Sequence, residues 1–472
     1  MKIASVSILL LSWNGRHHLE HCLPALARQE PADVDVEIVL LDNGSTDGTS
    51  AWAREHYPEV RVLRSDVNLG FCGGNNRLAA EARGDALILL NDDTRPHETW
   101  LAELVDAARR ADEDVAAVSG LIVDWRGERL DFGRGLVAFD GHAFQHGYRR
   151  PLDEARDRGL IPGDGEPLLF ACGGNMLMRR DLFRQLGGFD NNFFAYLEDV
   201  DLGWRTWSAG YRVLAAPSAV VQHRSMATSQ QLGNANRGFL FERNAFLTVA
   251  KNLDDVARQL LMPAIWMTLV HRSQTLLVQN NLGGEQLTLN PYAGLIANTA
   301  SPGSEPEAVE VKASEAAVGV EEAEAPAASE APEALFVAGT GGLPKLSLAE
   351  KWRGYGPKGF VQRGLRKAAR LALPKFLFDE PAAATSLTDP RTVAQLQAMT
   401  WILAHHDEAL DARDVIQQRR RRSDHDIFEL FPPAVVPTYP GDRRLFASRA
   451  FEEALGGVQV RRLALDEVMD LE

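Results

Sequence analysis

Two pairs of adjacent acidic residues are the side chains best suited to do chemistry. Asp92 and Asp93 follow an apolar run, and Glu198 and Asp199 lie within an apolar and aromatic stretch. Carboxylate oxygens are the ligands that hard divalent cations prefer, and a diphosphate can complete the coordination of such an ion. A carboxylate among apolar neighbours can also act as a general base toward a hydroxyl group. The first pair predicts a metal and phosphate site, and the second pair predicts a proton acceptor.

Three further polar clusters share the position of Asp92 and Asp93, because each follows a short apolar run. They are Ser12-Trp13-Asn14, the stretch 42–49 and the glycine-rich stretch 68–76. In the stretch 42–49, the carboxylate of Asp42 can accept hydrogen bonds from a nucleoside base or a ribose. In the stretch 68–76, glycine lets the backbone approach a ligand closely. The clusters therefore predict a nucleotide site.

Each feature also has a purely structural interpretation. The stretches 42–49 and 91–94 could each be a turn followed by a capped helix, because Asp, Asn and Ser favour both. The acids around Glu198 could be the acid-rich first turn of a helix. A single histidine after a strand, as at His223, is more often structural than a ligand. Four polar clusters at successive strand ends favour the functional interpretation over these alternatives.

The elements that must position these residues are visible as alternating strand and helix patterns up to residue 125. The predicted strands are 6–11, 36–41, 60–63, 86–90 and 115–119, and the predicted helices are 16–28, 46–56, 75–82 and 100–110. Strands that are apolar on both faces and alternate with helices indicate an α/β fold with a mainly parallel sheet flanked by helices. Right-handed crossovers place the carboxyl ends of such strands at one edge, where ligands bind.

The remainder of the chain changes character several times. We expect residues 126–235 to add short strands to the sheet and residues 236–300 to be a helical extension. The segment 301–334 contains nine Glu, one Lys and no aromatic residue, so we predict a disordered acidic linker over 301–340. Residues 341–472 are predicted to form a helical, basic C-terminal region.

Overall composition excludes several classes of protein. The formal net charge of −15 argues against nucleic-acid binding. The three cysteines, Cys22, Cys72 and Cys172, form no CxxC pair, which argues against a zinc site or a disulfide framework. No signal peptide and no apolar window of 18 residues is found, so we expect a cytoplasmic protein without a transmembrane helix.

One basic region nevertheless suggests contact with a membrane surface. Residues 351–378 carry eight Lys or Arg and no acid, interleaved with aromatic residues, and Arg419–Arg422 form a second basic cluster. Such a segment can lie on an anionic membrane, so we predict peripheral membrane contact through 351–422. The alternative is a solvated helix packed on the rest of the protein.

In this order along the chain, the clusters resemble those of the inverting glycosyltransferases of family 2, which have the GT-A fold. The resemblance covers residues 3–250 and implies a catalytic domain over 1–235, with a nucleotide-binding half (1–125) and an acceptor half (126–235). It implies that Asp199 is the catalytic base and that Asp93 and His223 hold Mg²⁺ or Mn²⁺. The residues that it implies for binding the nucleotide-sugar donor are Ser12, Trp13, Asn14, Asp42, Asn68, Gly70, Asn75, Asn76 and Asp92.

The wording of the motifs is most similar to the rhamnosyltransferase-like branch of this family. That resemblance implies a dTDP-sugar or UDP-sugar donor and a glycan or lipid-linked acceptor, with Gly173, Gly174 and Glu198 on the acceptor side. Asn91 departs from the stricter Asp-x-Asp metal motif, and an amide is a weaker ligand than a carboxylate. The QxxRW signature of processive synthases is absent, which favours transfer of a single sugar.

Two other functions compete with this one. A nucleotidyltransferase usually needs a basic, glycine-rich loop after the first strand, whereas this chain has only Gly15 there. A non-catalytic carbohydrate-binding or scaffold protein would not need Asp42, Asp93 and Asp199 together. A dehydrogenase is disfavoured because no GxGxxG follows the first strand.

Overall fold

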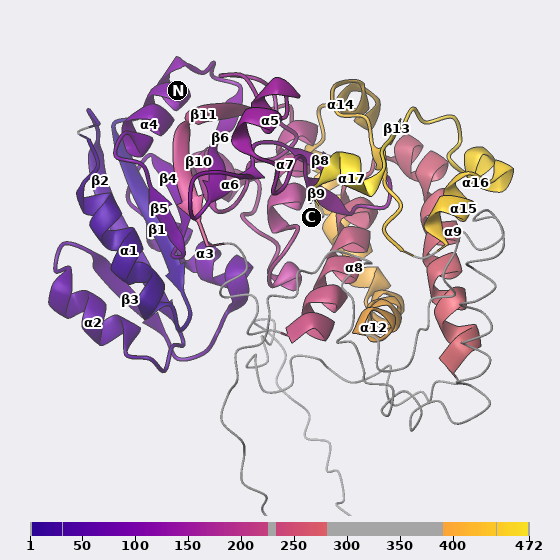
Figure 1. Cartoon of the computed structure of the whole chain (residues 1–472), viewed down its shortest axis with the longest axis horizontal. Coiled ribbons are helices and arrows are strands. Elements are labelled where there is room, and N and C mark those ends of the chain that lie inside the picture. Colours follow the sequence, from indigo (N-terminus) through magenta and orange to yellow (C-terminus); the bar gives the residue numbers. More distant parts are fainter. Residues whose placement is uncertain (1, 31, 225–232, 281–389, 440, 471–472) are drawn as a thin grey trace, which may run out of the picture.

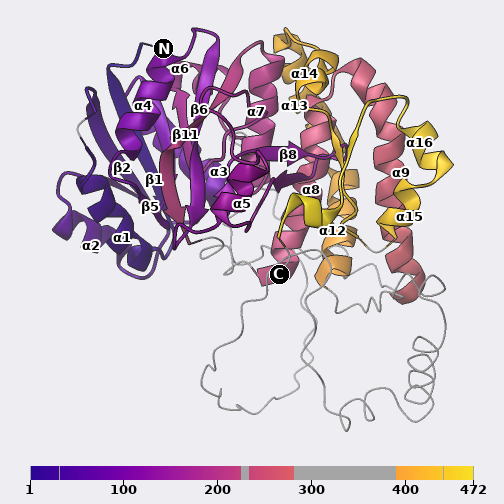
Figure 2. The ribbon, with the colours of Figure 1, turned by 45° about the horizontal axis from the view of Figure 1, so that its top comes forward.

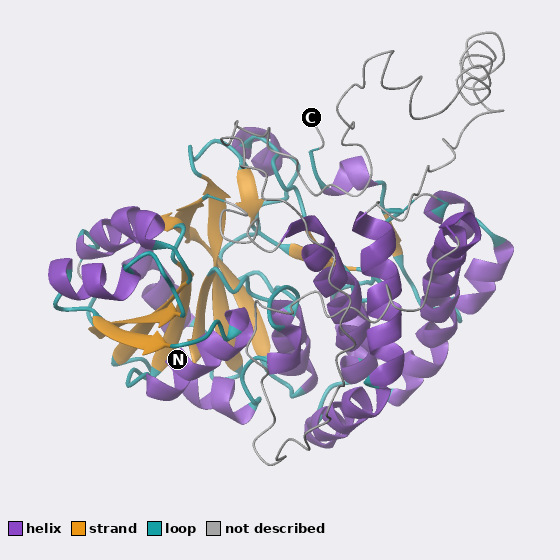
Figure 3. Cartoon of the chain, turned by 90° about the horizontal axis from the view of Figure 1, so that it is seen from below, coloured by secondary structure: helices purple, strands orange, loops and turns teal. Residues whose placement is uncertain are grey.

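The computed structural model describes residues 2–30, 32–224, 233–280, 390–439 and 441–470. Its strands gather in one half of the molecule and its long helices lie side by side in the other (Figure 3). The predicted linker 301–340, and the segment 351–378 with its basic residues, lie outside the described residues.

The first half is built on a nine-stranded sheet in the order β3-β2-β1-β4-β10-β6-β11-β5, with β7 paired to β6. Its strands are β1 (Ser5–Ser12), β2 (Asp35–Asn43), β3 (Arg61–Ser65), β4 (Ala86–Asn91), β5 (Thr94–Pro96), β6 (Val115–Asp124), β7 (Leu130–Phe132), β10 (Asn175–Arg179) and β11 (Arg212–His223). The strands β1 to β4 are parallel, as predicted, and β11 is parallel to β6. The strands β10, β5 and β7 run antiparallel to their neighbours, so the complete sheet is mixed. The α/β fold class is confirmed.

Each parallel strand is followed by a helix that packs on the sheet, as the alternating pattern predicted. These helices are α1 (Arg16–Ala27), α2 (Thr49–His56), α3 (Gly70–Glu81) and α4 (Trp100–Arg110), and shorter helices follow as α5 (Leu152–Asp157), α6 (Arg180–Gln185), the 3₁₀ turn η1 (Asn191–Phe193) and α7 (Glu198–Ser208). The central strands are buried on both faces; in β1, five consecutive residues from Val6 are buried. That burial explains why residues 8–11 of β1 are all apolar rather than alternating.

The second half consists of helices from both sides of the undescribed segment 281–389. It contains α8 (Gly233–Asn252), α9 (Asp255–Asn280), α12 (Pro390–Ala404), α13 (His406–Arg419), α14 (Asp424–Leu430), α15 (Asp442–Phe446), α16 (Arg449–Ala454) and α17 (Leu465–Val468). Two small sheets complete the structure, one of β8 (Gly135–Val137) with β9 (Ala143–Gln145) and one of β12 (Ala434–Val435) with β13 (Arg461–Arg462). Both views place α7 between the sheet and the long helices (Figures 1 and 2).

The two halves share one hydrophobic core. A single cluster of buried side chains runs from Leu9 in β1 through Trp207 in α7 to Phe246 in α8 and Phe451 in α16. A buried ion pair also links the helices to the earlier part of the chain: Arg272 of α9 contacts Asp140, between β8 and β9 (3.2 Å), and within the helical half it pairs with Asp442 of α15 (2.8 Å). The described residues beyond 235 therefore share a core with the sheet.

Candidate active site at the carboxyl edge of the sheet

The register of the central strands brings the predicted clusters together. Ser12 at the end of β1 pairs with Asp42 in β2, and Leu11 pairs with Asn91 at the end of β4. The first, second and fourth clusters therefore start at one level of the same sheet edge. Gly15 packs so closely on Ser12 and Asp92 that a Cβ atom at this position would overlap both side chains. Glycine is therefore required where the first and fourth clusters meet.

Asp42 is fully buried and already has protein partners. Its Oδ1 accepts a hydrogen bond from the Ser45 backbone N–H (2.8 Å), and its Oδ2 contacts the Ser50 hydroxyl and the Arg64 guanidinium. The Arg64 side chain is 43% exposed, so it is the partner that a ligand could displace most easily. The predicted contact between Asp42 and a base would require such an exchange.

The first and second clusters are tied together by Asn14. Its backbone N–H donates to the Ser45 hydroxyl (2.9 Å), and its Oδ1 accepts from the Thr46 N–H (2.8 Å). Asn14 has φ +52°, a backbone conformation that Asn tolerates better than most residues. The half-buried Trp13 lies immediately before it. The polar residue at position 14 thus has a structural function, whether or not it also contacts a nucleotide.

The glycine-rich stretch is where the expected boundary was wrong. We predicted a loop up to Asn75, but α3 begins at Gly70, so most of this stretch is the first part of a helix. The Asn43 side chain sets that start: its Nδ2 donates to Asn68 Oδ1 (2.9 Å) and its Oδ1 accepts from the Leu69 N–H (2.9 Å). Asn68 Oδ1 also accepts from the Gly70 N–H (2.9 Å). These local bonds offset the low helix propensity of glycine.

The two asparagines at the end of this stretch face protein groups. Asn75 is buried and donates to the Phe71 carbonyl (3.0 Å). Asn76 donates to the Phe189 carbonyl (2.7 Å) and accepts from the Phe189 N–H (2.9 Å). Both ends of the Asn76 amide are therefore engaged by the segment before η1. A donor contact from Asn76 stays a prediction, and it would have to replace these bonds.

Asp93 and His223 are in direct contact. His223 Nε2 lies 3.2 Å from Asp93 Oδ1, and His223 Nδ1 lies 2.9 Å from Asp131 Oδ2. The antiparallel pairing of β5 with β11 produces this contact, because it sets His223 opposite Thr94. Although burial alone lowers it, the charges of Asp93 and Asp131 raise the pKa of His223 well above its usual value. Asp131 was not predicted from the sequence; an acid between two buried apolar residues in β7 is the signal that could have found it.

The adjacent carboxyl group behaves differently. Burial, and next the negative charge of Asp93, raise the pKa of Asp92 to about 8. Against the effect of burial, the charge and hydrogen bond of His223 hold the pKa of Asp93 below its usual value. At neutral pH the pair therefore keeps one proton on Asp92 and one negative charge on Asp93.

The donor set at Asp93 and His223 fits a divalent cation that is shared with a phosphate ligand. Within the described ranges, no three His, Cys, Asp or Glu side chains are grouped so that they could hold a metal by themselves. Mg²⁺ sites of this kind use one or two carboxylates and fill the remaining positions with substrate phosphates and water. A histidine ligand also typically has a carboxylate on its other ring nitrogen, as Asp131 is on His223.

The second acidic pair lies at the start of α7. Glu198 is buried, whereas Asp199 is partly exposed and accepts a hydrogen bond from the Gly173 backbone N–H (3.2 Å). Gly174, the next residue, lies against Asn91, because its carbonyl accepts from the Asn91 N–H (3.4 Å). Since β10 is antiparallel to β4, its amino end lies at the carboxyl edge of the sheet. The residues Gly173 and Gly174 therefore join the base candidate to the metal-motif strand.

Burial sets the titration of this pair. It raises the pKa of Asp199 to about 6, although hydrogen bonds from the backbone N–H groups of Gly173 and Val200 oppose the shift. Burial, and next the charge of Asp199, raise the pKa of Glu198 well above its usual value. At neutral pH Asp199 is the ionised member, which is the state that a general base requires.

A strained turn precedes the second pair. Phe194 has φ +62° and ψ −60°, and the Ala195 N–H donates to the Phe193 carbonyl (2.7 Å), which together define a γ-turn. Tyr196 and Leu197 also have positive φ, at +71° and +64°. Backbone strain of this kind costs about 1–3 kcal/mol per residue and occurs mainly at functional sites. The chain therefore reaches Asp199 through a segment that its surroundings must hold in place.

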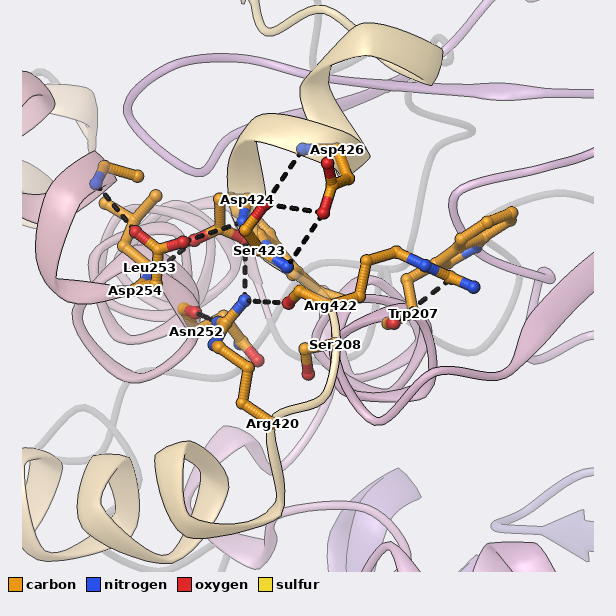
Figure 4. A network of polar contacts seen from close by, with 12 residues as sticks. Trp207, Ser208, Asn252, Leu253, Asp254, Arg420, Arg422, Ser423, Asp424 and Asp426 are labelled. Carbon is orange, nitrogen blue, oxygen red and sulfur yellow. Dashed lines mark hydrogen bonds and ion pairs between the residues drawn. The ribbon is translucent and has the colours of Figure 1, made fainter.

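Outside the site, the basic cluster Arg419–Arg422 is docked on the protein itself. The backbone N–H groups of Arg421 and Arg422 both donate to the Ser208 carbonyl at the end of α7 (2.7 and 3.0 Å), and the Arg422 side chain donates to the Trp207 carbonyl (3.2 Å). Figure 4 shows how Arg420 and Asp424 continue this network toward Asn252 and Asp254. For this cluster the packed-helix alternative describes the contacts.

Asp424, two residues after this cluster, also contacts α7. Asp424 accepts a hydrogen bond from Trp204 Nε1 (2.8 Å). The C-terminal region thus caps and packs the helix that carries Asp199. None of the helices in the described part of the chain is long and apolar enough to span a bilayer.

Comparisons with known proteins agree with this geometry. The family profile described as "Glycosyl transferase family 2" matches residues 7–187, and a second, "N-terminal domain of galactosyltransferase", matches residues 170–228. The N-acetylglucosaminyl-diphospho-decaprenol L-rhamnosyltransferase of Mycobacterium tuberculosis (strain CDC 1551 / Oshkosh) is 34% identical over 242 residues, which cover 47% of this chain and 77% of that protein. The glycosyltransferase AglE of Haloferax volcanii is 25% identical over 223 residues, covering 46% and 66%.

Among solved structures, that of GalNAc-T7 with UDP, GalNAc and Mn²⁺ is similar, with a TM-score of 0.42 and 19% identity, covering 56% of this chain and 50% of that one. The chain belongs to glycosyl transferase family 2. It is a glycosyltransferase, which confirms the family resemblance seen in the sequence.

Proposed function

We propose that this glycosyltransferase moves a single sugar from a nucleotide-diphosphate donor, such as dTDP-rhamnose or a UDP-sugar, with inversion at the anomeric carbon. The observation that carries the proposal is the bridge formed by Gly173 and Gly174. Through it, an ionisable carboxylate on Asp199 is linked to Asn91, the last residue of β4 and two residues before Asp93. A single displacement needs such a base on one side of the sugar and the leaving group on the other.

In this reaction Asp199 takes the proton of the acceptor hydroxyl while the hydroxyl oxygen forms a bond to the anomeric carbon. The bond from that carbon to the phosphate oxygen breaks, and its electron pair leaves with the nucleoside diphosphate. Attack from the face opposite the leaving group inverts the configuration. The protonated Glu198 beside Asp199 can donate a hydrogen bond to the acceptor without adding charge.

Asp93 and His223 would hold Mg²⁺ or Mn²⁺, with Asp131 fixing the orientation of the imidazole. A bound divalent cation supplies neutralisation of the charge that develops on the departing diphosphate. Ser12, Asn14 and Asp42 lie at the same sheet edge, where they could contact the nucleoside. A nucleobase would bind to the buried Asp42 by displacing the exposed Arg64 side chain from it.

The acceptor that we propose is a glycan or lipid-linked sugar, which is supported by the name of the Mycobacterium tuberculosis relative, an N-acetylglucosaminyl-diphospho-decaprenol L-rhamnosyltransferase. A lipid-linked acceptor would bring the protein to the membrane surface. Because Arg419–Arg422 are engaged within the protein, we assign that contact to the basic residues of 351–378. Cosedimentation with anionic vesicles, before and after deletion of 351–378, tests this; equal binding of the two proteins would contradict it.

The donor site is tested by thermal unfolding with UDP, dTDP and GDP, each with and without Mn²⁺, on the wild type and Asp93→Ala. A ligand at 100 times its dissociation constant stabilises the native state by about 2.7 kcal/mol. We expect a metal-dependent stabilisation by one nucleotide that is lost in Asp93→Ala. Absence of a shift with every nucleotide would contradict the proposed donor site.

A further inference from the structure

Three carbonyls of the strained turn 193–197 accept hydrogen bonds from one buried side chain of the helical half. Asn244 of α8 is fully buried, and its Nδ2 lies 3.0 Å from the Phe193 carbonyl oxygen and 2.8 Å from those of Ala195 and Tyr196. An amide NH₂ group has two protons, so at least one proton must be shared between two of the three carbonyl oxygens. Three carbonyl oxygens thus converge on one donor group.

The neighbouring residue extends this support. Arg243 Nη2 donates to the carbonyls of Asn192 (2.6 Å) and Phe193 (2.9 Å), and its guanidinium lies over the Trp401 ring of α12 at 4.9 Å. Two consecutive residues of α8 therefore bind the carbonyls of 192, 193, 195 and 196. Removing these donors would take the side-chain hydrogen bonds away from four carbonyls in a backbone that is already strained.

The turn contacts both sides of the proposed reaction. On the base side it leads directly into Glu198 and Asp199. On the donor side, the Phe194 ring covers Gly70 so closely that a Cβ there would overlap it, and the Phe194 carbonyl accepts from the Cys72 N–H (3.1 Å). A shift of the turn would move the amino end of α3 and the amino end of α7 together.

We infer that Asn244, assisted by Arg243, is a positioning residue for sugar transfer that keeps the turn 193–197 in the conformation that places Asp199 against Gly173 and Phe194 against Gly70. The inference rests on the proposed function, because the position of Asp199 affects activity only if Asp199 is the catalytic base. Asn244 lies outside both matched family segments, 7–187 and 170–228. The helical half thus supplies part of the catalytic geometry.

The experiment compares Asn244→Ala with Asn252→Ala and Asp199→Asn. Asn252 is a matched control, because it is also a fully buried asparagine of α8 but donates to Asp201 (2.8 Å) and to no carbonyl of the turn. Hydrogen–deuterium exchange is measured over 191–200 and 70–73, with α4 as a reference region. Hydrolysis of dTDP-rhamnose and of UDP-sugars is measured with Mn²⁺ on the same proteins.

We expect Asn244→Ala to increase exchange in 191–200 and 70–73 at least about tenfold, with α4 unchanged. We expect its kcat to fall about 10- to 100-fold with little change in donor KM, since misplacement by about 1 Å can have that effect. Asn252→Ala should lower thermal stability but leave exchange in the turn and most of kcat intact. Arg243→Lys keeps the charge but removes the guanidinium group that donates to the carbonyls of Asn192 and Phe193. It should show a smaller effect in the same direction.

Unchanged exchange in 191–200 for a folded Asn244→Ala would overturn the inference, and so would equal losses of kcat in Asn244→Ala and Asn252→Ala. If Asn244→Ala fails to fold, Arg243→Lys decides the question by the same two measurements. Retained activity in Asp199→Asn would instead contradict the proposed function, while the exchange result would still report on the turn.

Discussion

The two acidic pairs contain the same chemical groups, but their partners differ. Asp93 faces His223, which is backed by Asp131, whereas in the described part of the chain Asp199 accepts hydrogen bonds from the backbone N–H groups of Gly173 and Val200 and forms no ion pair. Against the effect of burial, His223 holds the pKa of Asp93 below its usual value, so Asp93 stays ionised over the neutral range. Asp199 is partly exposed and has backbone partners, and desolvation raises its pKa to about 6, so it can exchange a proton.

The comparison therefore separates two functions that sequence alone treats alike. The pair at the end of β4 is built to keep a charge, which suits a cation or a phosphate ligand. The pair at the start of α7 is built to accept a proton. Three substitutions test this difference between the two pairs, from the largest expected effect to the smallest.

Asp199→Asn removes the proton acceptor and keeps the size and much of the hydrogen bonding of the side chain. We expect kcat to fall about 10²- to 10⁴-fold, the usual contribution of a general base, with donor binding retained. Steady-state kinetics and nucleotide-induced thermal shifts measure the two quantities separately.

The matched control for Asp199→Asn is Asp201→Asn, on the same helix. Asp201 is fully buried and forms ion pairs with Arg205 (2.8 Å) and Lys251 (3.1 Å), so its loss should lower stability, by about 3–5 kcal/mol, more than it lowers kcat. If Asp199→Asn kept wild-type kcat, the second pair would not be the base, and the distinction would fail.

Much of this distinction could be predicted from the sequence, because strand ends are local features. The segments 8–11, 38–41 and 86–90 are unbroken apolar runs because these parts of β1, β2 and β4 are largely buried, and their common register follows from parallel pairing. The family resemblance implied that Asp93 is a metal ligand and Asp199 the catalytic base. The positions of both residues are consistent with these roles, which stay predictions.

The remaining features depend on contacts between residues far apart in the chain. Asp131 reaches His223 across 92 positions, and Asn244 reaches Ala195 across 49. No local pattern reports such pairs. The start of α3 at Gly70 was missed because side-chain bonds from Asn43 and Asn68 override the low helix propensity of glycine. The arginines at 419–422 suggested a free basic surface because sequence does not show that carbonyls of α7 receive them.

The second prediction concerns the partner that the sequence did not reveal. In Asp131→Asn an amide replaces the carboxylate that contacts His223 Nδ1 and accepts from Gln145 Nε2 (2.9 Å). Loss of such a supporting carboxylate typically weakens metal affinity about 10- to 100-fold. We expect calorimetry to show that decrease in Mn²⁺ affinity when the stabilising nucleotide is present. The acid limb of the kcat/KM profile, which we assign to Asp199, should not move.

Asp153→Asn serves as the control for charge removal in that experiment, because the Asp153 side chain is almost fully exposed and pairs only with Arg156 on the surface. Equal Mn²⁺ affinity in wild type and Asp131→Asn would mean that His223 is not oriented for a cation. In that case the first pair would have to bind the phosphates through some other group.

The smallest expected effect is on the pH profile of Glu198→Gln, and it is the sharpest test of how the second pair titrates. In the wild type, kcat/KM should fall about tenfold per pH unit below about 6, because Asp199 must be ionised to act as a base and burial holds its pKa there. Burial, and next the charge of Asp199, raise the pKa of Glu198, so we expect it to be the protonated member of the pair in that range, and glutamine reproduces that neutral form.

The acid limb of Glu198→Gln should therefore stay within about half a pH unit of the wild-type limb, even if the maximal rate falls through loss of an acceptor contact. A displacement of the limb by one unit or more would mean that the ionisation of Asp199 depends on the protonation of Glu198. The second pair would then titrate as a coupled dyad, and the apparent pKa would belong to both residues together. If the acid limb of Glu198→Gln does not move, burial of Asp199 by α7 and the Gly173 segment is the cause of its raised pKa.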